Sequence, residues 1–172
     1  KSMKKIILTL FVLTCVANST YSQKWENYFQ FGVGTGYLMD ANFSDTPLLQ
    51  YEYGKTLNWF DLVVAIEYAN SQTFKDEHIS LLVKTKFDLV RIFAPDTRHS
   101  VKLGVGSGIG TNKLEDWYDN EGNSYLYSIS SLMASYEYKL VDKTWLGVFF
   151  NNYPDDNFFG LHYVGLSIRR NF

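Results

Sequence analysis

Apolar and polar residues alternate along most of the chain with a period of two. Near the start of this pattern, Trp25, Phe29, Phe31, Val33 and Tyr37 occupy one set of alternate positions, and the residues of the other set are mostly polar or glycine. Successive side chains of a β-strand point to opposite faces of the sheet. The segment is therefore predicted to be a strand with one apolar face and one polar face.

The same alternation predicts seven further strands along the chain. They lie near 49–54, 60–68, 78–89, 101–110, 125–140, 144–151 and 161–172, and the strand near 125–140 is the least regular in phase. Most have the length that a tilted strand needs to cross a bilayer. Pro47, Pro95 and Pro154 are expected in the connections, because proline interrupts a hydrogen-bonded ladder. The pattern predicts an all-β fold, an eight-stranded antiparallel up-and-down barrel.

The first 22 residues differ from the rest of the chain. Lysines precede an apolar run over 6–16, which is too short to span a bilayer as a helix. Small residues, Thr20 and Ser22, then form a cleavage site. These features predict a cleavable signal peptide with its leader residues over 1–22 and one barrel domain over 23–172.

Composition limits the chemistry of the predicted mature domain. The formal net charge is −2 and no Lys/Arg-rich cluster occurs, so nucleic acid is not an expected partner. The single cysteine, Cys15, lies in the predicted signal peptide, which leaves no disulfide, thiol nucleophile or cysteine-ligated metal. Aromatic residues make up 17% of the chain, a large share for a soluble domain.

A glycine at every second position marks the segment "GVGSGIG". A dinucleotide-binding loop needs G-x-G-x-x-G at the start of a helix, but the residue three positions after Gly106 is Ile109. The period of two instead places Gly104, Gly106, Gly108 and Gly110 on the inner face of a barrel strand. There they are expected to leave room for long side chains from the opposite wall.

Two kinds of eight-stranded barrel fit the alternation. A soluble, lipocalin-like carrier has an apolar interior, whereas a membrane barrel has an apolar exterior. The apolar rows of this chain are nearly free of charge, and aromatic residues such as Trp25, Tyr37, Trp59 and Tyr68 cluster near strand ends. Aromatic residues near strand ends are typical of the two membrane interfaces. The sequence therefore favours a transmembrane barrel.

The segment "HYVGLSIRRNF" carries a family resemblance. Its apolar residues Val164, Leu166 and Ile168 alternate up to a final aromatic residue, Phe172. This pattern is similar to the terminal strand of bacterial outer-membrane barrels, and the mature chain resembles the small OmpA/OmpX-type barrels. Arg170 departs from the apolar pattern and is expected to reach the interface. The resemblance implies an outer-membrane location, recognition of the Phe172 strand by the barrel assembly machinery, and contact with outer-membrane lipids and lipopolysaccharide.

An even number of strands places both termini at one end, which the resemblance implies is periplasmic. The four longer connections then lie outside the cell, and they are rich in acidic residues: Asp40, Asp45, Asp76, Glu77, Glu115, Asp116, Asp119, Glu121, Asp155 and Asp156, against Lys75 and Lys113. These loops are expected either to bridge divalent cations to lipopolysaccharide or to attract a basic partner. The alternative is that they are polar only because they lie in water. A monomer is expected.

One short motif raises the possibility of an enzyme. Lipid A deacylases use a His-x-Ser pair, and this chain has His78 and Ser80 on one face of a predicted strand. That face is the inner one, shared with Lys84 and Lys86, whereas the deacylase site faces lipid. Leu81 also stands where the deacylases are expected to have asparagine. An enzyme is therefore not predicted.

The remaining candidate ligands form no recognisable site. His99 is expected in a periplasmic turn and His162 on the outward face near the outer rim, each interfacial or solvated. The segment from Asp119 to Gly122 lacks the spacing of a calcium loop. No catalytic, cofactor-binding or metal-binding residue is assigned. The leading hypothesis is a non-enzymatic surface barrel, the second a narrow channel or transporter, and the third a lipid-modifying enzyme.

The predicted inner faces carry both signs of charge: Glu26, Glu52, Asp61, Glu67, Asp88 and Glu137, with Lys84, Lys86, Lys102 and Arg169. Unpaired charges in a narrow interior are costly, so they are expected to pair.

The register of each predicted hairpin indicates which charged residues lie opposite each other on neighbouring strands. With Glu67 opposite Ser80, Asp61 lies opposite Lys86, and a hairpin centred near Asp119 and Asn120 places Lys102 opposite Glu137. Such pairs, with Tyr28 and Tyr127, are expected to fill an eight-stranded interior and to close it to ions.

Overall fold

The computed structural model describes residues 25–37, 46–71, 76–94, 96–114, 123–154 and 162–172, so the predicted signal peptide lies outside the described residues. The described residues form eight antiparallel strands and one short helix. The elements are β1 (Glu26–Tyr37), β2 (Thr46–Leu57), β3 (Phe60–Ser71), β4 (Asp76–Asp88), α2 (Leu89–Phe93), β5 (His99–Leu114), β6 (Asn123–Val141), β7 (Thr144–Asn152) and β8 (His162–Asn171).

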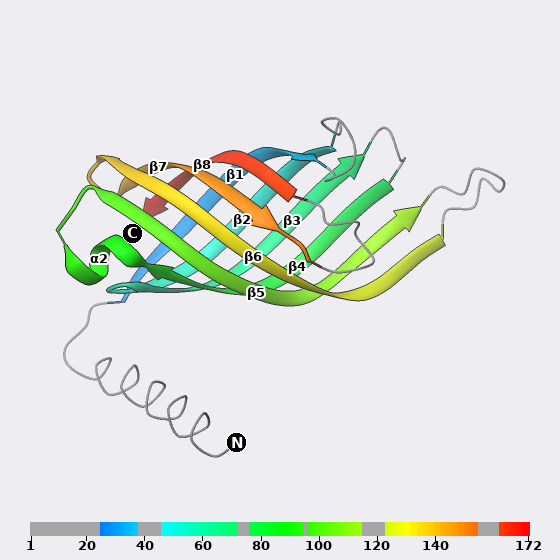
Figure 1. The fold of residues 1–172 in the computed structure, drawn as a ribbon, viewed down its shortest axis with the longest axis horizontal. Helices are drawn as coiled ribbons and strands as arrows, with labels where there is room; N and C mark the ends of the chain where they lie inside the picture. Colours follow the sequence, from blue (N-terminus) through cyan, green and yellow to red (C-terminus); the bar gives the residue numbers. More distant parts are fainter. Residues whose placement is uncertain (1–24, 38–45, 72–75, 95, 115–122, 155–161) are drawn as a thin grey trace, which may run out of the picture.

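The strands close into a barrel in chain order. Each strand pairs with the next, and β8 returns to pair with β1 (Figure 1). The predicted eight-stranded up-and-down barrel is confirmed. No helix in the described ranges is both long and apolar enough to cross a membrane.

The barrel is apolar on its outside and polar in its interior. Outward residues such as Phe31, Val64 and Leu166 are exposed, whereas the charged residues of the inward rows, such as Glu52 and Lys84, are buried. A soluble lipocalin-like barrel has the reverse arrangement. The fold is therefore that of a transmembrane barrel.

The start of β1 and the end of β8 lie side by side at one end of the barrel, here called the terminal end. Tyr28 lies opposite Asn171, and the backbone N–H of Phe172 donates to the carbonyl of Asn27 at 3.0 Å. Figure 1 shows α2 and the C-terminus at this end. The opposite end, where β1 is connected to β2, β3 to β4, β5 to β6 and β7 to β8, is called the loop end.

The four alternating glycines of β5 lie on the inner face, as predicted. The side chains that fill the space beside them come from the neighbouring strand, not from the opposite wall: Gly106 is paired with Ser131 and Gly110 with Tyr127. At Gly108 a Cβ atom would overlap the backbone carbonyl of Leu81 in β4. This glycine is needed because two backbones approach closely.

Three expectations about the ends of strands are wrong. Pro47 is the second residue of β2 and not part of a connection, which is possible because the ladder is just beginning there. Leu89 starts a helix instead of ending the fourth strand, because the Asp88 carboxylate caps the N–H groups of Val90 and Arg91. His99 is the first residue of β5 and not part of a turn.

Candidate functional site

The barrel interior holds two clusters of buried ion pairs. The terminal-side cluster consists of Asp61, Lys102, Glu137 and Arg169. Lys102 Nζ lies 2.7 Å from Asp61 Oδ2 and 3.0 Å from Glu137 Oε2. Arg169 Nη1 lies 3.3 Å and 3.2 Å from the same two oxygen atoms. Two cations thus share two carboxylates.

Neutral side chains complete the hydrogen bonds of Arg169. Its Nη2 donates to Thr56 Oγ1 at 2.8 Å, and its Nε donates to Asn171 Oδ1 at 2.9 Å. The guanidinium lies over the ring of Tyr28, 3.9 Å from the ring centroid. The Tyr28 hydroxyl donates to Asp61 at 3.3 Å. Arg169 is therefore held by charge, hydrogen bonds and cation–π contact together.

The central cluster consists of Glu52, Glu67, Lys84 and Lys86. Lys84 Nζ lies 3.0 Å from Glu52 Oε1 and 2.5 Å from Glu67 Oε1, and Lys86 pairs with the other oxygen of Glu52. Glu52 and Lys84 are both 0% exposed, so neither side chain is accessible to water. The centre of the barrel is closed by paired charges.

On the loop-end side, neutral side chains form hydrogen bonds in and around the central cluster. Asn151 donates to Gln50 Oε1 at 3.1 Å, and Tyr153 donates to Glu67. Burial raises the pKa of the Tyr153 hydroxyl, and the negative Glu67 raises it further. Tyr153 therefore keeps its proton and acts as a donor.

An apolar layer lies beside these groups. It is formed by buried residues from several strands, Leu48, Ala65, Ala69, Leu82, Ile129, Phe149, Tyr153 and Tyr163. Shape and packing, not only charge, therefore fill the interior.

One of the two predicted cross-strand neighbours is confirmed, and the other is wrong in its register. Asp61 does lie opposite Lys86, as predicted. Lys102 lies opposite Ser135 and not opposite Glu137, so the predicted register of that hairpin is wrong by two residues. A two-residue shift keeps both side chains on the inner face, and the long lysine reaches Glu137 diagonally.

The predicted inner-face charges are buried, with one exception. Glu26 is exposed at the terminal end, where its carboxylate accepts a hydrogen bond from Asn171 at 2.9 Å. Five carboxylates and four cations are buried among the described residues: Glu52, Asp61, Glu67, Asp88 and Glu137, with Lys84, Lys86, Lys102 and Arg169. The fifth cation is Arg91 of α2, whose Nε lies 3.4 Å from Asp88 Oδ2. The interior is thereby close to electrically neutral.

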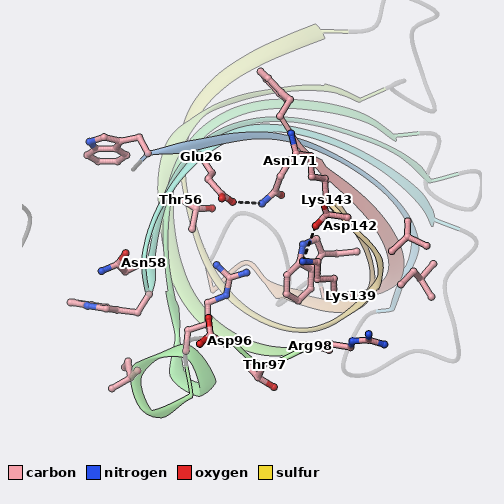
Figure 2. Close-up of a pocket in the computed structure, with 18 residues that line it drawn as sticks. Glu26, Thr56, Asn58, Asp96, Thr97, Arg98, Lys139, Asp142, Lys143 and Asn171 are labelled. Carbon is pink, nitrogen blue, oxygen red and sulfur yellow. Dashed lines mark hydrogen bonds and ion pairs between the residues drawn. The ribbon is translucent and has the colours of Figure 1, made fainter. Parts of the chain in front are cut away.

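A cavity of about 1080 Å³ opens at the terminal end, below the terminal-side cluster. Charged residues of both signs line it, among them Glu26, Arg91, Lys139 and Asp142. Figure 2 shows the Glu26–Asn171 hydrogen bond on one side of this opening and the Lys139–Asp142 ion pair on another. The buried terminal-side cluster lies at its inner end, and we call this cavity the vestibule.

The histidine–serine motif does not form a catalytic pair. His78 and Ser80 share the inner face, but His78 Nδ1 is hydrogen-bonded to the hydroxyl of Tyr127. Within the described part of the chain Ser80 Oγ has no hydrogen-bond partner. Its hydroxyl is 1% exposed and faces the interior, where a membrane lipid does not reach it.

The other two histidines each contact an aromatic side chain. His99 Nδ1 lies 2.8 Å from the Tyr136 hydroxyl. His162 lies in the outward row of β8, as expected, and its ring stacks on Phe150 with centroids 5.8 Å apart; it is 5% exposed and therefore not solvated. No group of three His, Cys, Asp or Glu side chains within the described ranges could hold a metal ion.

Most of the acidic residues expected at the loop end lie outside the described residues, as does the segment from Asp119 to Gly122. Asp76 and Glu77 are described, and they are the first two residues of β4 instead of part of a connection. Phe172, expected to be read by the assembly machinery, is exposed at the terminal end and stacks on Phe29 with centroids 5.1 Å apart.

Sequence reasoning missed several inward residues. Trp145, Phe149 and Asn151 all point inward from β7, where they alternate with Leu146, Val148 and Phe150. Both rows are largely apolar, so the pattern alone does not choose between them. The asparagines at the end of β7 do not choose either, because Asn151 lies in one row and Asn152 in the other.

Comparisons with known proteins agree on the fold. No family model matches the chain, and no curated protein matches its sequence. Among solved structures, Neisserial surface protein A is similar with a TM-score of 0.64 and 10% identity, over 86% of this chain and 97% of that chain. The N-terminal barrel domain of OprF from Pseudomonas aeruginosa has a TM-score of 0.55 and 12% identity, over 87% and 100%.

A third similar structure is Ail, the attachment invasion locus protein of Yersinia pestis, in complex with the heparin analogue sucrose octasulfate. Its TM-score is 0.55 and its identity 10%, over 87% of this chain and 99% of that chain. At these identities the likeness concerns the fold, that of small outer-membrane barrels.

Proposed function

We propose that this protein is a non-enzymatic barrel of the bacterial outer membrane that does not conduct solutes and acts through the segments at the ends of its strands. The observation that carries the proposal is the interior, in which buried carboxylates and cations pair across the lumen. Such a core holds the strands rigidly but leaves no path for ions. Function is then left to the surface.

The orientation is part of this proposal. Two of the three connections at the terminal end, Asn58–Trp59 and Asp142–Lys143, are two residues long, and the third, 89–98, contains α2; those at the loop end have four to nine residues. Outer-membrane barrels have short periplasmic turns and longer extracellular loops. We therefore assign the terminal end, with both termini, to the periplasm.

The first test is electrical. Purified, folded protein in planar bilayers is expected to give no steady unitary conductance, because the central cluster closes the lumen. A large porin recorded in the same membranes serves as the positive control. Stable, large unitary currents would contradict the proposal and favour the channel hypothesis.

The acid-rich segments at the loop end are the candidate contact surface. We propose that they bind lipopolysaccharide through bridging divalent cations, which carboxylates ligate well. A polyanion such as the sucrose octasulfate bound to Ail would meet negative charge there. We therefore do not propose that this protein binds sucrose octasulfate.

The second test compares two variants with the same number and kind of substitutions. Asp116→Asn with Asp119→Asn removes charge at the loop end, and Asp96→Asn with Asp142→Asn removes it at the terminal end. Calcium-dependent binding of purified lipopolysaccharide to protein in liposomes is measured by titration calorimetry. The loop-end variant is expected to bind several-fold more weakly and the control to bind as the parent does. Equal binding by both variants would contradict the proposal.

A further inference from the structure

The helix α2 presents an apolar face to its surroundings. Leu89, Ile92 and Phe93 occupy positions i, i+3 and i+4, which lie on one side of a helix. Their exposed fractions are 39%, 47% and 88%. A single exposed apolar residue is ordinary, but three on one turn form a continuous patch.

The other side of α2 is fixed to the barrel. The Asp88 carboxylate accepts the N–H groups of Val90 and Arg91, each at 3.1 Å, and also accepts the Ser100 hydroxyl at 2.6 Å. The Arg91 guanidinium lies over the ring of Trp145, 5.0 Å from its centroid. Trp145 is itself buried. These contacts set the rotation of the helix. Arg91 and Ile92 line the vestibule, whereas Leu89 and Phe93 do not.

The apolar face of α2 continues the lipid-facing surface of the barrel. The outward row of β4 runs through Val83 and Phe87 to Leu89, the first residue of the helix. The backbone N–H of Asp88 donates to the carbonyl of Trp59 at 2.7 Å, and the Trp59 ring stacks on Phe87 with centroids 5.9 Å apart. Aromatic clusters of this kind lie at the membrane–water interface.

We propose that α2 is a membrane-interface anchor whose apolar face enters the phospholipid leaflet at the terminal end of the barrel. The inference rests on the proposed membrane placement, in which this leaflet is the periplasmic one. Short amphipathic helices lie at the headgroup–acyl boundary with the apolar face buried and the polar face outside. Here Arg91, the polar residue of α2, lies on the vestibule side, and Leu89 and Phe93 are the residues expected to enter the leaflet.

The test uses a single fluorescent label. The only cysteine, Cys15, lies in the predicted signal peptide, so the protein purified without that segment accepts one new cysteine at a time. Phe93→Cys, Asp96→Cys and Val83→Cys are each labelled with the same environment-sensitive dye and reconstituted into phosphatidylcholine liposomes. Quenching is measured with an aqueous quencher and with nitroxide-labelled lipid. Asp96 is exposed in the turn after α2 and shows whether the dye inserts by itself.

The label at position 93 is expected to be several-fold less accessible to the aqueous quencher than the label at 96, and to be quenched by nitroxide near the headgroups. Equal aqueous quenching at 93 and 96 would overturn the inference. Protection at 93 without quenching by labelled lipid would also overturn it, because a protein would then cover the helix. The label at Val83 tests the transmembrane placement itself. If nitroxide-labelled lipid does not quench this label, the placement of the barrel in the membrane is wrong, and not only the role of α2.

Discussion

Replacing Arg169 with methionine is expected to lower the free energy of unfolding by about 3–5 kcal/mol, the usual cost of removing one partner of a buried ion pair. Methionine has a similar length but no charge and no donors. Asp61 and Glu137 would then share Lys102 as their only cation in the terminal-side cluster. The hydrogen bond to Thr56 would also be lost.

Arg170 provides the matched control, because it is the next residue of β8 and is exposed on the outward face. Arg170→Met is expected to leave stability nearly unchanged. Both variants are unfolded by urea in lipid vesicles and followed by tryptophan fluorescence, with heat-modifiable gel mobility as a second readout. Equal losses for the two variants would show that the interior pairs do not hold the barrel together.

Val83→Arg is expected to destabilise the barrel in a bilayer by about 2–4 kcal/mol, the cost of an arginine on the lipid-facing side near the membrane centre. Val83 lies on the outward row of β4, well inside the strand, and is 55% exposed. The arginine would face acyl chains and have no carboxylate beside it. Urea unfolding in vesicles measures the change.

Glu77→Arg is the control on the same row of β4. Glu77 is already charged and lies near the loop end of the strand, so an arginine there is expected to cost about 0–1 kcal/mol. If Val83→Arg were equally mild, the outward face of β4 would not be in contact with lipid.

The inward and outward rows of β1 to β5 could be predicted from sequence because their two faces differ sharply in polarity. In β2, Tyr51 and Tyr53 point outward, whereas Gln50 and Glu52 point inward. A shift of one residue would place Glu52 in lipid, so the pattern leaves one choice.

Sequence reasoning was weaker where this contrast fades. In β6, Ile129 and Met133 point inward and Ser128 and Ser130 point outward, which reverses the usual order. Apolar residues fit inside here because they pack into the apolar layer or against a glycine, as Met133 does beside Gly104.

The helix α2 was missed because five residues are too few to show a helical period. Leu89 follows the alternation of β4, so the pattern predicts that the strand continues through it. The cap made by Asp88 was the available signal, but aspartate is also common in turns. The vestibule was missed with it, because Arg91 and Trp145 meet only once the helix has formed.

The pairing of Arg169 with Asp61 joins residues 108 positions apart in the sequence, across the seam where β8 meets β1. A slip of β8 by two residues would keep its inward row inward, so polarity alone does not detect the error. It would, however, bring Ser167 or Asn171 to the position of Arg169 and leave two buried carboxylates with one cation. Only the observed alignment of β8 pairs all four charges, so the charged interior favours this alignment over others that keep the correct face.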